Sequence, residues 1–228
     1  MKTPREIYAA YTIMPSLQMH QLRVAAVAQL VCKNFSSEGG SASGGQKPIN
    51  ERDVVLACLF HDMGNIIKSE LSYFPDFTKP EGVEYWERVK ADGIKKYGND
   101  AHSANVSIAK EIGLPETILG LLDAVGYSRI EGVVGSSSFE LKLCQYADTR
   151  VGPRGILPQD ERLAEGRERY VGRKKNYYDT DDGFKRLSDF AHELERQIFA
   201  HMSIRPEDIS DVSVGPLIEK LWEYPIEP

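Results

Sequence analysis

The sequence has no long hydrophobic run. Its longest uninterrupted apolar segment, Val54 to Phe60, has seven residues, whereas a membrane-spanning helix needs about 20. Residues 1–6 are not followed by the apolar stretch that a secretion signal requires. We therefore expect a protein that has no membrane-spanning segment and is located in the cytoplasm.

Cysteines are also scarce. The three that occur, Cys32, Cys58 and Cys144, are odd in number, far apart and surrounded by apolar residues. A disulfide framework or a zinc knuckle needs paired or closely spaced cysteines. The pattern instead predicts buried, reduced thiols.

An excess of positive charge is missing as well. The chain has 28 Lys and Arg against 34 Asp and Glu, a net charge of -6, so stable binding to nucleic acid is not expected. Residues 150–175 carry a local excess of basic residues, for which a solvated helix face is the favoured interpretation. The hydrophobic fraction of 41% is that of an ordinary globular protein.

Apolar residues recur at helical intervals along nearly the whole chain. We expect an all-α fold, with a helical bundle over residues 1–152 and a C-terminal helical extension, residues 153–228, packed on the same core. One helix is predicted from Val54 to Ile67, and only Ile130 to Val134 indicates an extended segment. Residues 36–46, rich in glycine and serine, predict a flexible loop.

Four ionisable side chains fall on the apolar faces of these predicted helices: His20, His61, Asp62 and Asp148. Burying such groups is costly unless they are paired or bind a metal. Each has an ordinary explanation when taken alone, as a hydrogen-bonded core histidine or an aspartate paired with an arginine. Together they favour a shared divalent metal.

The order His20, His61-Asp62, Asp148 resembles the H…HD…D motif of the HD superfamily of metal-dependent phosphohydrolases. The resemblance covers residues 17–151 and includes the context LFHDMGN at residues 59–65. It implies that the four residues hold one divalent cation, of Mn, Mg, Co, Ni, Fe or Zn. The implied activity is hydrolysis of a small phosphomonoester or nucleotide by a metal-activated water, with Asp62 orienting that water.

The resemblance also implies a catalytic role for His102, either at a second metal or as a donor to the substrate phosphate. Dinuclear members carry a further histidine in the next helix, where this chain has none and only Asp123 could substitute. We therefore expect one metal per chain. The candidates for contacts with the substrate phosphate are Asn65, Lys68 and Arg150.

Two other functions stay open. One is a dinuclear-iron oxygenase of HD type, which needs more ligands than this sequence offers. The other is a non-catalytic module that binds nucleotides. Guanosine tetraphosphate hydrolases are disfavoured, because the Glu-Asp pair expected in them is replaced here by Asn65-Ile66. The sequence does not specify the base or sugar of a substrate, and it leaves a homodimer open.

Overall fold

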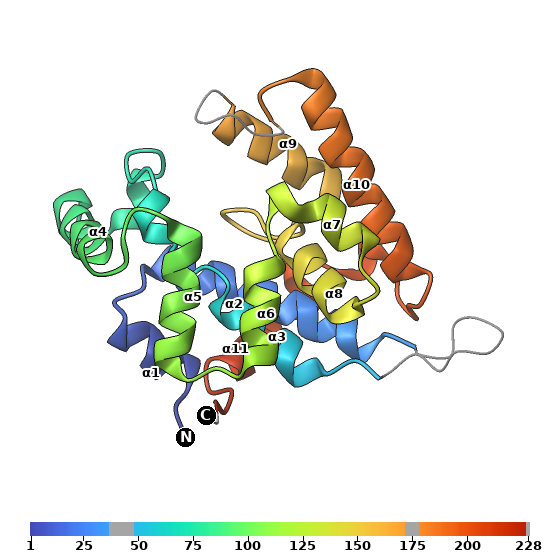
Figure 1. Ribbon diagram of the computed structural model, residues 1–228, viewed down its shortest axis with the longest axis horizontal. Coiled ribbons are helices and arrows are strands. Elements are labelled where there is room, and N and C mark those ends of the chain that lie inside the picture. The colour runs from blue at the N-terminus through green and yellow to red at the C-terminus, as the bar shows by residue number, and fades with distance from the viewer. Residues whose placement is uncertain (37–47, 172–177, 227–228) are drawn as a thin grey trace.

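A computed structural model describes residues 1–36, 48–171 and 178–226 (Figure 1). Within these ranges the chain forms eleven α-helices and no β-sheet, so the predicted all-α fold is confirmed. None of the described helices combines the length and the apolar character needed to cross a membrane. The predicted glycine- and serine-rich loop lies, apart from Ser36, outside the described residues.

Three helices form the centre of the molecule: α2 (Pro15–Lys33), α3 (Glu51–Phe60) and α8 (Phe139–Asp148). The start of α3 follows from Asn50, whose side chain accepts a hydrogen bond from a backbone N–H in the first turn. Helix α3 contacts both α2 and α8, and α6 (Glu116–Ala124) packs against it from a further side. Every residue from Val54 to Phe60 is buried at this junction.

A second group of helices lies beside α2 in Figure 1: α1 (Pro4–Ala10), α4 (Val83–Tyr97) and α5 (Ala101–Ile112). Two short 3-10 helices, η1 (Asn65–Lys68) and η2 (Pro75–Thr78), lie in the chain between α3 and α4. Helix α5 ends at Gly113, whose φ of 89° lies in the left-handed region that favours glycine. A small apolar cluster around Trp86 joins η1, α4 and α5.

The C-terminal part of the chain contributes to the main core. Helix α10 (Asp181–Phe199) packs against α8, and α11 (Asp211–Leu221) packs against α2. Helix α9 (Gln159–Tyr170) lies beside α10 (Figure 1). The ends of the described chain meet, since the backbone N–H of Ile226 donates to the Lys2 carbonyl at 2.9 Å.

The extended segment predicted at Ile130 to Val134 is wrong, because the structure forms a helix there, α7 (Ile130–Gly135). Ile130 and Val133 are three residues apart and both are buried, so they share one helical face. Glu131 lies on the exposed side and pairs with Arg186 at 2.6 Å. A short apolar run cannot be assigned to helix or strand by periodicity alone.

The three cysteines lie in the three central helices and are free and buried, as predicted. A hydrogen bond with Cys144, together with burial, holds the pKa of the Cys58 thiol well above its usual range. Burial likewise raises the pKa of Cys32. The thiols of Cys32 and Cys58 therefore stay protonated and unreactive.

Candidate metal centre

The central helices bring together the four predicted metal ligands, His20, His61, Asp62 and Asp148, which we call the tetrad. His20 lies in the second turn of α2, His61 directly follows the last residue of α3, Asp62 is the next residue, and Asp148 ends α8. Because α2, α3 and α8 contact one another in pairs, these three positions face a common point. The side chains keep between 8% and 21% of their surface exposed.

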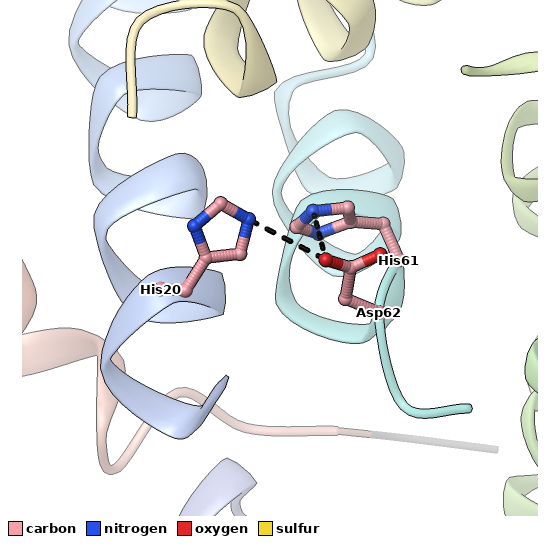
Figure 2. A group of neighbouring side chains, drawn as sticks. All are labelled: His20, His61 and Asp62. Atoms are coloured by element: carbon pink, nitrogen blue, oxygen red, sulfur yellow. Dashed lines mark ion pairs between the residues drawn. The ribbon is translucent and has the colours of Figure 1, made fainter. Parts of the chain in front are cut away.

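The four side chains alternate around a ring of nitrogen and oxygen atoms. His20 Nε2 lies 3.5 Å from Asp62 Oδ2 and 3.2 Å from Asp148 Oδ1. His61 Nε2 lies 3.6 Å and 3.5 Å from the same two oxygens. Figure 2 shows both imidazole rings directed at the Asp62 carboxylate. Each histidine nitrogen therefore sits between two carboxylate oxygens.

These spacings fit a bound cation. Ligand atoms about 2.1 Å from a common centre lie about 3.0 to 3.4 Å apart at octahedral or tetrahedral angles, close to the observed 3.2 to 3.6 Å. The ligand atoms of His20, His61 and Asp62 all lie within 4.8 Å of one another. Asp148 is not part of this group of three and contacts it through the two histidines. Two imidazoles and two carboxylates form a nitrogen and oxygen donor set that suits first-row divalent metals.

The orientation of His61 is fixed by its other ring nitrogen. His61 Nδ1 donates to the Cys58 carbonyl at 2.8 Å, which leaves Nε2 as the atom that faces the site. His61 Nε2 is buried and has no hydrogen-bond partner among the described residues. The carboxylates at 3.5 and 3.6 Å are thus ion-pair partners of this nitrogen. A buried ring nitrogen held in this way is suited to bind a metal.

The two partly buried carboxylates dominate the electrostatics of the site. Burial disfavours the Asp148 carboxylate, but the close contacts with His20 at 3.2 Å and His61 at 3.5 Å, together with the charge of the two histidines, outweigh it and hold the pKa of Asp148 well below its usual value. Burial also disfavours a charged His61, yet the charges of Asp62 and Asp148 raise the pKa of His61 to about 9. Without a metal, a proton on His61 compensates part of the negative charge.

This arrangement predicts how the metal-free protein responds to pH. The pKa of His61 rises from 6.5 to about 9 on folding, so its contribution to stability is fully present below pH 6.5 and is lost as pH rises to about 9. We expect the melting temperature in EDTA to fall across this interval, and the fall to be smaller in a His61→Gln variant. Thermal scans of both proteins between pH 6 and 9.5 measure the melting temperature at each pH. An equal fall of the melting temperature in both proteins would contradict the prediction.

Two buried amides hold the turn that follows His61. The backbone N–H of Asp62 donates to Gln21 Oε1 at 3.2 Å, and that of Met63 donates to Asn105 Oδ1 at 2.8 Å. In a continuing helix both N–H groups would donate to carbonyls four residues back. Sequence reasoning missed both amides, because they act across 41 and 42 residues of chain.

The carbonyls that a longer α3 would use are also taken by side chains. Cys58 accepts from His61 Nδ1, and Leu59 accepts from the Tyr8 hydroxyl at 2.6 Å. The helix therefore ends at Phe60, and the prediction of one helix from Val54 to Ile67 is wrong. The early end turns Asp62 toward the site.

Gly64 lets this turn lie against α5. A Cβ at Gly64 would overlap the Ala101 carbonyl oxygen and lie 2.8 Å from the Asn105 nitrogen. Backbone atoms of a helix cannot give way cheaply, so only glycine fits at this position. The glycine after the His-Asp pair is thus explained by close packing.

Gly64→Ala is expected to destabilise the protein by about 1–3 kcal/mol, the usual range for overpacking. The matched control is Gly120→Ala in α6, where an added Cβ meets nothing within 4 Å; it should stabilise the protein by about 0.4–1 kcal/mol. Urea unfolding of the three proteins measures both changes. Equal midpoints for the two variants would show that α5 does not constrain the turn.

His102 lies in the first turn of α5, and the structure places Asp123 beside it. His102 Nε2 lies 3.0 Å from Asp123 Oδ1 and 3.3 Å from a guanidinium nitrogen of Arg129. Arg129 ends η3 (Tyr127–Arg129), and its guanidinium also donates to the Asp123 carbonyl. His102 is 35% exposed. It therefore forms a separate polar group with its own anion and cation.

Two of the predicted phosphate contacts lie on η1. Asn65 begins η1 three residues after Asp62, and its backbone N–H donates to the Asp62 carbonyl at 3.0 Å. Lys68 ends η1 with its side chain exposed. No described contact joins either side chain to the tetrad, so their contact with a phosphate stays a prediction.

The third predicted phosphate contact, Arg150, lies elsewhere. It is only 2% exposed, and its guanidinium donates to the Tyr146 hydroxyl and to backbone carbonyls of the C-terminal part. These carbonyls belong to Leu157 at 2.7 Å, Pro206 at 3.1 Å and Ile209 at 3.3 Å. The structure thus assigns Arg150 a structural role, instead of the predicted contact with substrate.

No protein-family model, curated protein or solved structure matches this chain. The resemblance to the HD superfamily therefore depends on the motif and on the convergence of the tetrad.

Proposed function

We propose that this protein is a metal-dependent phosphohydrolase of HD type that acts on a small phosphomonoester or nucleotide. The observation that carries the proposal is the alternating ring of two imidazole nitrogens and two carboxylate oxygens, spaced 3.2 to 3.6 Å apart. It comes from three helices, and its side chains stay partly exposed.

His20, His61, Asp62 and Asp148 would hold a divalent cation. Such a cation polarises a phosphoryl oxygen and lowers the pKa of bound water. Asp62 has a further task, because its Oδ2 faces both histidines. Its second oxygen makes no hydrogen bond within the described ranges and can accept one from a water. In this role Asp62 orients the nucleophile.

His102 would donate a hydrogen bond to the substrate. Its neighbour Asp123 lies 3.0 Å from the ring nitrogen and orients the ring, and the hydrogen bond with His102, together with the charge of Arg129, lowers the pKa of Asp123. Because His102 is partly exposed, it can meet a phosphate that enters from solvent.

The same contacts support a single metal. A second cation would need His102 and Asp123 as ligands, but the Arg129 guanidinium already lies against both. The positive charge of the Arg129 guanidinium would repel a metal ion bound at this place. The dinuclear-iron alternative is therefore the weaker one, and it would require Arg129 to move away.

The test is a screen for phosphatase and phosphodiesterase activity on nucleotides and sugar phosphates. The EDTA-treated protein is supplied in turn with Mn²⁺, Mg²⁺, Co²⁺, Ni²⁺, Fe²⁺ and Zn²⁺, and its metal content is measured in parallel. We expect one metal per chain and activity only with metal. Nucleotide binding without turnover would favour the binding module, and two irons per chain would favour the oxygenase.

A further inference from the structure

A second cluster of polar side chains surrounds Asp148 on the side of α9. Its members come from three elements: Gln145 from α8, Tyr127 from η3 and Arg162 from α9. Gln145 lies three residues before Asp148, so the two share one side of α8. None of the three was a sequence-based candidate. We name them the donor cluster.

The negative charge of Asp148 acts on both Tyr127 and Arg162, and hydrogen bonds connect the donor cluster to the backbone around Asp148. The Gly126 N–H, next to Tyr127, donates to Gln145 Oε1 at 2.7 Å. The Arg162 guanidinium lies 5.5 Å from the centre of the Tyr127 ring, and Arg162 Nε donates to the Val151 carbonyl at 2.7 Å. The Val151 N–H in turn donates to the Asp148 carbonyl at 3.3 Å.

The donor cluster has donors that lack acceptors. Gln145 Nε2 and the Tyr127 hydroxyl are buried and have no hydrogen-bond partner in the part of the chain that the structure describes. Arg162 is only 5% exposed; its Nη1 pairs with Glu165 at 3.1 Å, while its Nη2 makes no hydrogen bond to a described residue. Buried donors are nearly always satisfied in folded proteins, so an acceptor from outside the chain is expected here.

The charge of the donor cluster favours an anionic acceptor. Glu165 is shared between Arg162 and Arg169, which binds it at 2.8 and 3.0 Å. One carboxylate therefore serves two guanidiniums. The second negative charge that acts on Arg162 is the Asp148 carboxylate; a cation at the tetrad would neutralise it, and the guanidinium charge then favours an anion. Burial raises the pKa of Tyr127 well above its usual value, which keeps its hydroxyl a donor.

Close packing holds the Arg162 guanidinium in this place. A Cβ at Gly166 would lie 3.0 Å from Arg162 Nη1 and 2.8 Å from the Tyr178 hydroxyl. Gly166 thus provides the room that the guanidinium occupies. A side chain at this position would displace Arg162 from the Tyr127 ring.

We propose that Gln145, Tyr127 and Arg162 form an oxyanion subsite that binds the non-bridging oxygens of the substrate phosphate beside Asp148. This inference rests on the proposed function and replaces Arg150 by Arg162 as the guanidinium that recognises phosphate. Planar guanidinium donors match phosphate oxygens, and the phenol and amide donors add hydrogen bonds from two further directions.

Inorganic phosphate is the probe for this subsite. Its binding to the full chain is measured by calorimetry with Mn²⁺ and again in EDTA, and Mn²⁺ binding is followed separately by electron paramagnetic resonance. We expect Tyr127→Phe to weaken phosphate binding about tenfold and Arg162→Lys about a hundredfold under both conditions. Mn²⁺ binding should be unchanged in both variants.

Two matched controls separate this role from general effects. Tyr73→Phe removes a phenol hydroxyl from a side chain that is 43% exposed, and Arg167→Lys changes a guanidinium on the same helix that pairs with Asp181. Both should bind phosphate as the wild type does. Tyr127→Phe keeps its ring packing, so it remains informative if Arg162→Lys does not fold.

The outcomes distinguish the subsite from the proposed function. Wild-type phosphate affinity in Tyr127→Phe or in folded Arg162→Lys, with Mn²⁺ bound, would overturn the subsite and leave the metal site standing. Absence of phosphate binding to the wild type would overturn it as well. Arg162-dependent phosphate binding by a protein that binds none of the six metals of the activity screen would instead support the subsite and overturn the proposed function.

Discussion

Asp62→Asn is expected to lower metal-dependent phosphate release at least about a thousandfold, the scale at which loss of one member of a catalytic unit acts. Asp62 Oδ2 is the oxygen that both histidine nitrogens face, at 3.5 and 3.6 Å. An asparagine has nearly the same size but no negative charge, and its amide nitrogen cannot bind a cation. The variant therefore loses one ligand and the acceptor that orients water.

The measurement is initial rate against metal concentration, together with metal content after dialysis. Asp182→Asn is the matched control, because Asp182 is an exposed aspartate in the first turn of α10; its rate should equal that of the wild type. Asp62→Asn should remain folded, since its side chain is 20% exposed. A folded Asp62→Asn protein with undiminished activity would exclude the tetrad as the site of hydrolysis.

The tetrad could be predicted because each member breaks a strong local rule. His20 and Asp148 lie on apolar helix faces, and His61-Asp62 ends the most hydrophobic stretch of the chain. An ionisable group in such a place needs a partner, and four of them suggest a common one. The sequence could not specify which helices meet, and the convergence of α2, α3 and α8 is what the structure adds.

The residues that support the tetrad could not be predicted, because their roles depend on tertiary contacts. Asn105 is an ordinary helical residue until α5 lies against the turn at Met63, 42 residues away. Gln145 shows nothing unusual until Gly126 donates to it across 19 residues. Such residues obey local rules, and only their buried, specific contacts reveal them.

The basic residues in segment 150–175 are a second case in which the sequence could not predict a role that depends on tertiary contacts. The sequence favours one solvated face for its arginines, whereas the structure buries Arg162 between Tyr127 and the Val151 carbonyl. Arg167, five residues later, stays partly exposed and pairs with Asp181. Spacing along one helix does not tell which arginine meets another helix, since that depends on how α9 lies against η3 and α8.

Replacement of Arg150 is expected to have the second large effect, a loss of stability of the folded protein. Its guanidinium joins the end of α8 to η4 (Pro206–Asp208) and the start of the C-terminal helix. Truncating it would leave the acceptors at Leu157 and Pro206 without their donor, and would leave the Tyr146 hydroxyl beside Glu195 at 3.0 Å. Removing one side of a buried charged network is strongly destabilising.

Arg150→Gln is therefore expected to destabilise the protein by about 3–5 kcal/mol, measured as the shift of the urea midpoint. The control Arg205→Gln changes an arginine that is 78% exposed and should leave the midpoint unchanged. The two possible roles of Arg150 predict different results. If Arg150 contacted the substrate phosphate, its replacement would raise KM and leave the stability unchanged. The buried contacts predict the reverse: a lower midpoint, with KM unchanged in the fraction that stays folded.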